Sequence, residues 1–453
     1  MKEIRKVLIA NRGEIAVRII RTLREMGIAS VAVYSEGDRN SLHVRMADES
    51  VCIGPAQARE SYLKSDNIVS AALSTGADAV HPGYGFLSEN AEFSRSCAKN
   101  GIIFIGPSPD SIKLLGHKAT ARSIAQKAGV PVTPGSSGCV EKDFIKEAEK
   151  IGFPVMIKAA AGGGGRGIRI VYDREKLLHE CEMAKSEAMA AFANDEIYFE
   201  KYIEKPRHIE IQFMRDTHGN VVAFAERDCS VQRRNQKLIE ETPSPAVSPE
   251  LRKKLQKAAR NLADSADYHG AGTVEFLLDK SGEFYFMEVN TRLQVEHPVT
   301  EFISGADLVR QQILVASGAR LEITQKDADD FRGHSIEHRI NAEDWRNNFM
   351  PSVGKVSEWI LPGGPGIRVD SHVYPGYELP VYYDSMIAKL ITWAPDRNKA
   401  IARSLRAIED FKIEGVKTTL GAHKKILSST EFMSGDLDTK FLERFMAGDE
   451  FKK

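Results

Sequence analysis

The chain of 453 residues carries 62 Lys and Arg against 63 Asp and Glu, and 42% of its residues are hydrophobic. These values exclude a disordered chain and a strongly basic nucleic-acid-binding protein, and the length predicts about three domains. No apolar run is long enough to span a bilayer, so no membrane partner is expected. The five cysteines form no CxxC pair and no leader segment is recognisable, which predicts a cytoplasmic protein without a structural zinc site.

The N-terminal part alternates short apolar runs with helical patterns. Residues 6–10 form an apolar strand, residues 15–26 place apolar side chains at helical spacing, and residues 30–36 read as a second strand. The same unit recurs over residues 78–106. This alternation predicts an α/β domain with a doubly wound parallel sheet. The loop after the first strand, NRGE, lacks the GxGxxG fingerprint, so no NAD site is expected.

The pattern changes twice further along the chain. From about Gly116, helical segments alternate with strand-rich segments, which predicts a central α+β domain. Beyond about Phe331, strands separated by Pro and Gly turns precede an amphipathic helix, and a smaller β-rich C-terminal domain is expected. The predicted boundaries are residues 1–115, 116–330 and 331–453.

A glycine-rich loop lies between two strand-like runs and follows Lys158. It consists of Gly162, Gly163, Gly164, Gly165, Arg166 and Gly167. Glycine lets backbone N–H groups approach phosphate oxygens closely, and the two cations add positive charge. The alternative is a flexible linker or a simple hairpin tip. The framing by Lys158 and Arg166 favours a mobile hairpin that covers phosphates, although the loop is not a Walker A motif.

Polar residues alternate with apolar ones in the segment FMEVNTRLQVEHP. If this segment is extended, one face carries Glu288, Asn290, Arg292, Gln294 and Glu296. Carboxylate and amide oxygens suit Mg²⁺ or Mn²⁺, and Glu275 of TVEFLL could add a third carboxylate. The alternative is an ordinary half-buried strand with a solvated face. The Asn, Arg and Gln content of the polar face favours a binding site.

Three further clusters leave similar alternatives open. His208, Glu210 and Gln212 share one face of a predicted strand, where a structural histidine is the alternative. Positive charge gathers before a predicted turn, in the cluster of Gln232, Arg233, Arg234 and Lys237. The alternative for this cluster is a solvated surface. Glu337, Arg339 and Asn341 alternate in EHRINAED, for which the alternative is an edge strand.

A series of long motifs occurs in one order along the chain. They are HPGYGFLSEN from His81, GHKATAR from Gly116, KAAAGGGGRG from Lys158, RHIEIQ from Arg207, RDCSVQRRNQK from Arg227, MEVNTRLQVEHPVTE from Met287, RINAED from Arg339 and YYDSMIAKL from Tyr382. In these motifs the chain resembles biotin carboxylase, an ATP-grasp enzyme, over essentially its whole length. The resemblance implies a Rossmann-like N-terminal domain, an ATP-grasp domain with a mobile glycine-rich lid at about residues 131–204, and a C-terminal domain.

The resemblance also implies a reaction and its participants. MgATP, bicarbonate and biotin on a separate protein would give carboxybiotin, ADP and phosphate, with carboxyphosphate as the intermediate and two divalent ions, Mg²⁺ or Mn²⁺, beside the nucleotide. ATP would contact residues 162–167 and Lys118, Lys158, Glu200, Lys201, His208 and Gln232. The metal ligands would be Glu275, Glu288 and Asn290. Bicarbonate would contact Lys237, Arg292, Gln294 and the backbone of Val295. Glu296 would take its proton, and Arg339 would face the ureido oxygen of biotin.

Two residues depart from the commoner family pattern. Asn235 stands where many members have His, and His338 stands where many have Cys. The second residue is expected on the opposite face of its strand from Arg339. Neither departure removes a residue to which chemistry is assigned.

The expected partners follow from what the chain lacks. It contains no Ala-Met-Lys-Met biotinylation motif, so the biotin carboxyl carrier protein and the carboxyltransferase are expected to be other polypeptides, and the family resemblance implies a homodimer. The resemblance favours acetyl-CoA carboxylase of fatty-acid synthesis, with a two-subunit pyruvate, 2-oxoacid or other acyl-CoA carboxylase as the alternative. An inactive scaffold relative would have lost metal or base positions, which this chain retains. A carbamoyl-phosphate synthetase half would bring a second repeat, which is absent from the sequence.

Overall fold

The computed structural model describes residues 3–136, 138–159, 168–192, 194–448 and 451. The predicted glycine loop, residues 162–167, lies outside the described residues. The chain divides into two compact units. The first comprises residues 1–130, 207–276 and 287–453, and the second comprises residues 131–206 and 277–286. Among the described residues, no helix combines the length and the apolar character needed to cross a bilayer.

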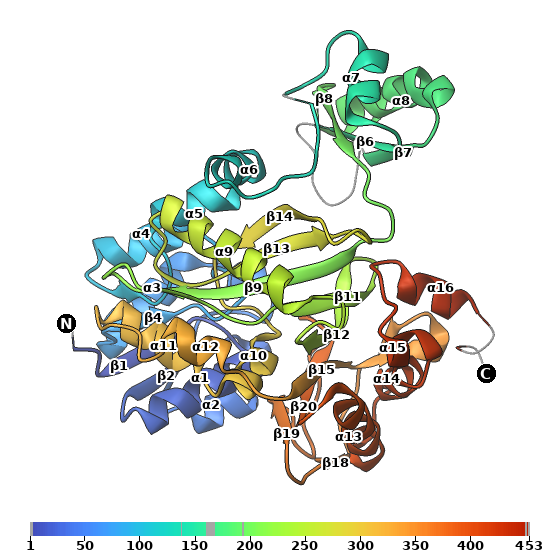
Figure 1. The fold of residues 1–453 in the computed structure, drawn as a ribbon. Coiled ribbons are helices and arrows are strands. Elements are labelled where there is room, and N and C mark those ends of the chain that lie inside the picture. Colours follow the sequence, from blue (N-terminus) through green and yellow to red (C-terminus); the bar gives the residue numbers. More distant parts are fainter. Residues whose placement is uncertain (1–2, 137, 160–167, 193, 449–450, 452–453) are drawn as a thin grey trace. The chain divides into compact units, whose positions relative to one another are not determined.

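The first unit begins with a parallel sheet of five strands (Figure 1). In spatial order they are β3 (Glu49–Cys52), β2 (Ala29–Tyr34), β1 (Lys6–Ile9), β4 (Ala79–His81) and β5 (Ile103–Phe104). The helices of this region are α1 (Gly13–Glu25), α2 (Leu42–Met46), α3 (Ser65–Thr75), α4 (Ala91–Lys99), α5 (Pro109–Gly116) and α6 (Lys118–Lys127). Val7 and Ile9 belong to one apolar cluster and Leu8 to another, so both faces of the sheet are buried. The predicted doubly wound α/β sheet is confirmed.

A nine-stranded sheet follows. Its strands in spatial order are β14 (Phe284–Asn290), β13 (Gly270–Leu278), β9 (Arg207–Arg215), β11 (Arg227–Arg233), β12 (Gln236–Thr242), β15 (His334–Asn341), β20 (Met386–Ala394) and β19 (Ile367–Ser371), with β10 (Val221–Ala223) beside β9. Neighbours from β9 to β19 pair antiparallel. Because β12 pairs with β15, the segments predicted as the second and third domains share one sheet. The three-domain division stays a prediction.

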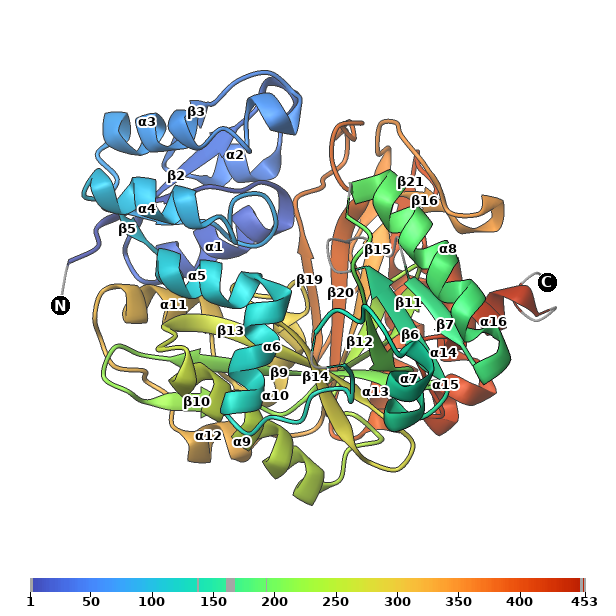
Figure 2. The same ribbon diagram turned by 90° about the horizontal axis from the view of Figure 1, so that it is seen from above.

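Strand β15 lies inside this sheet, between β12 and β20 (Figure 2). The alternative of an edge strand is therefore wrong. Helix α10 (His297–Ser304) contacts β12, β15 and β20, and α13 (Arg397–Asp410) also contacts β15 and β20. Ile336 and Ile340 join the apolar cluster that contains Ala400 of α13. Strand alternation turns the intervening polar residues, Glu337 and Arg339, to the face that α10 covers.

The first unit also contains further helices and short strands. The helices are α9 (Pro249–Ser265), α11 (Leu308–Ala316), α12 (Gln325–Asp329), α14 (Leu420–Leu427), α15 (Thr430–Ser434) and α16 (Phe441–Ala447). The short strands are β16 (Glu343–Asp344), β17 (Met350–Pro351), β18 (Glu358–Ile360) and β21 (Lys412–Glu414). Strands β16 and β17 pair with each other, as do β18 and β21.

The turn between β11 and β12 explains one departure from the family pattern. Arg234 and Asn235 have φ values of 51° and 64°, and Arg233 pairs with Gln236 across the turn. A two-residue hairpin with both central residues at positive φ is favoured by the twist of the flanking strands, and Asn tolerates that conformation. Asn235 therefore suits the turn that places Lys237 opposite Gln232.

The second unit contains a three-stranded antiparallel sheet. Its strands in spatial order are β7 (Ile168–Val171), β6 (Val155–Ala159) and β8 (Ile197–Lys201). Helices α7 (Phe144–Ile151) and α8 (Arg174–Phe192) contribute Ala148 and Leu177 to its apolar core. The predicted pairing of the strands before and after the glycine run is confirmed, because β6 and β7 pair antiparallel.

Acid sensitivity of the nine-stranded sheet is expected from Glu241 of β12. Its carboxylate accepts hydrogen bonds from Arg397 at 2.7 and 3.0 Å and lies 2.8 Å from Nε2 of His334. Burial raises the pKa of Glu241, but the bonds from His334 and Arg397 outweigh it and lower the pKa from 4.5 to about 2. The resulting stabilisation, about 3 kcal/mol, is present above pH 4.5 and is lost as the pH falls toward 2.

Urea unfolding of Glu241→Gln and of the wild type at pH 7 and at pH 3 tests this expectation. We expect the variant to unfold at lower urea concentration at pH 7, with a smaller difference at pH 3. The exposed Glu204 provides the matched control, Glu204→Gln. An equal difference at both pH values would contradict the role of the Glu241 charge.

Candidate functional site

Lys237 of β12 lies among three carboxylates. Its Nζ is 2.7 Å from Oε2 of Glu210 on β9, 3.0 Å from Oε1 of Glu275 on β13 and 2.7 Å from Oε1 of Glu296. Burial lowers the pKa of the Lys237 ammonium, but the surrounding thiol and carboxylates outweigh burial and raise it well above 10.5. The lysine is therefore a fixed positive charge in the middle of the cluster.

Glu296 is held between two cations. It occupies the N-cap position of α10, and its second carboxylate oxygen, Oε2, accepts a hydrogen bond from Nη2 of Arg339 at 3.0 Å. Burial raises the pKa of Glu296, but the charges of Lys237, Arg339 and Arg227 outweigh burial and lower it well below 4.5. Glu296 is thus an ionised, fully buried carboxylate, which is the form that accepts a proton.

The predicted extended segment is wrong beyond Asn290. Strand β14 ends at that residue, and a loop leads to α10, whose first turn contains Pro298. Proline suits the first turn of a helix because its missing N–H has no intrahelical acceptor there. The backbone N–H of Thr291 donates to Oε1 of Glu89 at 2.9 Å, so a side chain replaces a strand partner.

The polar side chains of this loop nevertheless meet at one place. Arg292 donates to Oδ1 of Asn290 at 3.1 Å, to Oε1 of Gln294 at 2.7 Å and to Oε2 of Glu89 at 3.0 Å. The amide nitrogens of Asn290 and Gln294 in turn donate to Oε1 of Glu275 at 2.9 and 3.0 Å. The loop therefore joins the guanidinium of Arg292 to the carboxylate that Lys237 contacts.

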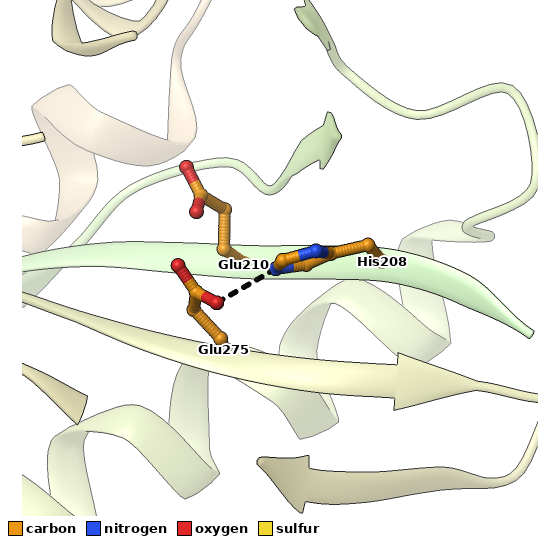
Figure 3. A group of neighbouring side chains, drawn as sticks. All are labelled: His208, Glu210 and Glu275. Atoms are coloured by element: carbon orange, nitrogen blue, oxygen red, sulfur yellow. Dashed lines mark ion pairs between the residues drawn. The ribbon is translucent and has the colours of Figure 1, made fainter. Parts of the chain in front are cut away.

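Three neighbouring side chains on β9 and β13 offer a candidate metal centre (Figure 3). One ligand atom from each of His208, Glu210 and Glu275 lies within 4.8 Å of the others, and Nε2 of His208 is 2.8 Å from Oε2 of Glu275. The alternation that placed His208 and Glu210 on one face of a strand is confirmed. In this structure the ammonium of Lys237 contacts both carboxylates, at 2.7 Å from Glu210 and 3.0 Å from Glu275. We therefore interpret His208 and Glu210 as groups that surround the Lys237 ammonium and not as metal ligands.

Of the predicted metal ligands, Glu275 belongs to this cluster, and the other two are residues of β14. Asn290 contacts Glu275 directly, whereas Glu288 is half-buried and lies 3.6 Å from Nζ of Lys118. Carboxylate and amide oxygens are the ligands that Mg²⁺ and Mn²⁺ prefer, so the chemistry of the donor set fits these ions. Lys118 beside Glu288 adds a positive charge for a phosphate chain.

The residues predicted to contact ATP belong to both units. Lys118, His208 and Gln232 lie in the first unit, and Gln232 pairs with Lys237 in the β11–β12 hairpin. In the second unit Lys158 forms an ion pair with Glu200. The ammonium of Lys201 in that unit donates to the carbonyls of residues 152 and 153 at 2.9 and 2.7 Å.

Sequence reasoning assigned no role to three carboxylates that hold the site. They are Glu89, Glu210 and Glu240. Oε1 of Glu240 accepts a hydrogen bond from Nε of Arg339 at 2.6 Å. The alternation of Glu210 with His208 was a usable signal, because both side chains leave one strand on the same face. No local signal pointed to Glu89, whose partner Thr291 is 202 residues away in the sequence.

Comparisons with known proteins identify the family. Sequence profiles match over residues 3–112 (Biotin carboxylase, N-terminal domain), 117–324 (Carbamoyl-phosphate synthase L chain, ATP binding domain) and 337–444 (Biotin carboxylase C-terminal domain). The chain is 55% identical over 440 residues to a biotin carboxylase of Nostoc sp., a match that covers 97% of this chain and 98% of that protein. The chain belongs to the biotin carboxylase family. The family is one of ATP-grasp ligases, so the predicted enzyme class is confirmed.

Two further relatives carry other names. A protein of Methanothermobacter thermautotrophicus named as a pyruvate carboxylase subunit is 51% identical, over 98% of this chain and 90% of that protein. The biotin carboxylase domain dimer of the 2-oxoglutarate carboxylase of Hydrogenobacter thermophilus was solved with MgADP, ADP and bicarbonate. It matches with a TM-score of 0.91 and 47% identity and covers 100% of both chains. The family resemblance and the multidomain α/β and α+β fold class predicted from the motifs are confirmed.

Proposed function

We propose that this chain carboxylates biotin on a separate carrier protein, using bicarbonate and MgATP and releasing ADP and phosphate. The observation that carries the proposal is the buried carboxylate of Glu296 between the cations Lys237 and Arg339. The Hydrogenobacter thermophilus relative was solved with MgADP and bicarbonate, which supports the same choice of substrates here.

Two cations and two neutral polar groups near Glu296 would bind bicarbonate. We assign this role to Lys237, Arg292, Gln294 and the backbone of Val295. Bicarbonate is a weak nucleophile, and a carboxylate within hydrogen-bond reach can take its proton as it attacks the γ-phosphorus of ATP. Glu296 is the base in this proposal. An arriving anion would compete for Lys237 and Arg339, and weaker contacts to these cations would make Glu296 a better proton acceptor.

Arg339 is proposed to bind the ureido oxygen of biotin. Carboxyphosphate would split into CO₂ and phosphate, the phosphate would take the N1′ proton, and N1′ would attack the CO₂. A fixed guanidinium would stabilise the negative charge that forms on the ureido oxygen. Glu240 and Glu296 hold the Arg339 side chain by hydrogen bonds of 2.6 and 3.0 Å. The guanidinium therefore has little freedom to reorient when charge develops.

Nucleotide binding is assigned to residues of both units. The proposed ATP contacts are Lys118, Lys158, Glu200, Lys201, His208 and Gln232, together with residues 162–167. Glu275, Glu288 and Asn290 would hold two Mg²⁺ or Mn²⁺ ions. When bound, such ions would neutralise charge on the transferring phosphoryl group. We also propose the three-domain division at residues 1–115, 116–330 and 331–453, with a lid at about residues 131–204.

The metal role of Glu288 predicts a changed metal requirement. We expect Glu288→Gln to raise the KM for MgATP and to recover activity as free Mg²⁺ or Mn²⁺ is raised, because an amide is a weaker ligand than a carboxylate. ADP formation titrated against each metal measures this effect. Glu283→Gln, at an exposed position beside the same strand, is the control. An unchanged metal dependence in Glu288→Gln would argue against the ligand role.

The proposal also covers the molecule that finally receives the carboxyl group and the subunits that complete the enzyme. A biotin carboxyl carrier protein and a carboxyltransferase would complete a cytoplasmic acetyl-CoA carboxylase of fatty-acid synthesis. The Methanothermobacter thermautotrophicus relative, named for pyruvate carboxylase, supports a second candidate, the same half-reaction in a two-subunit pyruvate or 2-oxoacid carboxylase. The dimer of the Hydrogenobacter thermophilus domain supports a homodimer.

ADP formation by the purified chain tests the proposed half-reaction. MgATP is supplied throughout, and bicarbonate, free biotin or a purified biotin carrier protein is omitted in turn. We expect ADP formation to depend on bicarbonate and to rise with biotin or with the carrier. ADP formation that responds to neither bicarbonate nor biotin would contradict the proposal and favour the scaffold alternative.

A further inference from the structure

Lys389 is a buried lysine to which the proposed reaction assigns no role. It belongs to the motif YYDSMIAKL, and its side chain is 0% exposed. In the sheet it pairs with Arg339 of β15 on one side and with Asp370 of β19 on the other. Paired residues of neighbouring strands project from the same face. Helix α10, whose N-cap position Glu296 occupies, packs against β15 and β20 on that face, where Lys389 contacts the residue before Glu296.

The ammonium of Lys389 contacts a neutral carbonyl oxygen and a carboxylate, and it also lies 5.8 Å from the centre of the Tyr84 ring. It donates a hydrogen bond to the carbonyl oxygen of Val295 at 2.9 Å, and it lies 3.1 Å from Oε1 of Glu14 on α1. The hydroxyl of Tyr84 also donates to that oxygen of Glu14. A buried lysine requires a counterion, and Glu14 meets this requirement. The bond to Val295 is not needed for charge balance.

The bond to Val295 acts on the peptide that precedes the base. The peptide unit is planar, so a fixed carbonyl direction also fixes the Cα position of Glu296. The preceding carbonyl, that of Gln294, accepts a hydrogen bond from Nδ1 of His297 at 2.8 Å. Lys237 and Arg339 hold the carboxylate of Glu296 itself. Lys389, a residue of the sheet, therefore holds the backbone of this loop by a hydrogen bond.

We propose that Lys389 is a positioning residue for bicarbonate deprotonation: its hydrogen bond to the Val295 carbonyl orients the peptide that carries Glu296 and the bicarbonate-binding backbone of Val295. Glu14 keeps the ammonium charged and in place. This inference rests on the proposed function. It assigns an orienting role to Lys389, which does not itself touch the substrates.

Two variants separate orientation from charge balance. Lys389→Met keeps the approximate length and removes both donor and charge, and Glu14→Gln with Lys389→Met leaves no unpaired charge in the pair. We expect both to lower kcat/KM for bicarbonate by about 10- to 100-fold, since small misplacements near the reacting atoms have effects of this size. The KM for MgATP should change by less than about twofold, because the nucleotide contacts are unaltered. Glu14→Gln alone retains the Lys389 ammonium and its donor to Val295 but removes the counterion, so it should lower kcat/KM for bicarbonate by less than Lys389→Met.

Each result distinguishes orientation from a structural role. Recovery of wild-type kcat/KM for bicarbonate in the double variant would show that Lys389 only balances Glu14, and would overturn the proposal. Parallel losses of kcat/KM for MgATP and for bicarbonate would also overturn the proposal. The same holds if thermal unfolding measurements show that neither variant folds. A wild-type enzyme without bicarbonate dependence would refute the proposed function. A bicarbonate-dependent wild type with an unaffected Lys389→Met would refute only the positioning role.

Discussion

Replacing Glu296 by Gln is expected to lower bicarbonate-dependent ADP formation by about 10²- to 10⁴-fold, the usual contribution of a general base. Gln has nearly the same shape but accepts no proton at neutral pH. The KM for MgATP should stay close to the wild-type value, because Glu296 acts on the nucleophile and not on the nucleotide. Steady-state kinetics with each substrate varied in turn measures both effects.

Glu210→Gln is the matched control for the charge of Glu296. Glu210 and Glu296 both lie 2.7 Å from Nζ of Lys237, but only Glu296 also contacts Arg339. If Glu296 is the base, substitution of Glu296 should lower turnover far more than substitution of Glu210. Glu210 also pairs with the buried Arg227. Equal losses would mean that both carboxylates serve only to hold the neighbouring cations, and wild-type turnover in Glu296→Gln would refute the base assignment outright.

Arg339→Met is expected to lower carboxylation of biotin by about 10²- to 10³-fold, the size of effect found when one donor to a developing oxyanion is removed. ATP cleavage that depends on bicarbonate but not on biotin should fall much less, because it precedes the step on biotin. Carboxybiotin formation and ADP formation measured in the same reaction give the two rates.

Arg339→Lys provides the control for charge alone. Lysine keeps the positive charge but not the planar fork that contacts Glu240 and Glu296 together. We therefore expect an intermediate loss of biotin carboxylation. Equal losses of ATP cleavage and of biotin carboxylation in Arg339→Met would show that the guanidinium serves mainly to hold Glu296, and the biotin role would then be wrong.

The parts of the fold that follow from local backbone geometry could be predicted. Strand alternation correctly placed His208 and Glu210 on one face of β9. The strands on either side of the glycine run pair as expected, as do the parallel strands of the N-terminal sheet. These features depend on the period of side-chain direction within one element and on short connections.

The parts that depend on neighbours distant in the sequence could not be predicted. The segment after Asn290 alternates like a strand, yet Glu89 binds the N–H of Thr291 and the chain turns into α10. The edge-strand alternative for EHRINAED failed for a related reason. Strand β15 pairs with β12 and β20, and no local pattern reveals the order of strands in a sheet.

The sequence by itself determined the family, the enzyme class and the kinds of side chain that the chemistry needs, because ordered motifs and residue types are properties of the chain alone. Only the tertiary structure decided which charges meet. Lys237 contacts three carboxylates and Lys389 reaches Val295 because sheet order and burial bring together residues far apart in the sequence. Whether a carboxylate is ionised, neutralised or free to take a proton depends on those separations and on exclusion of water.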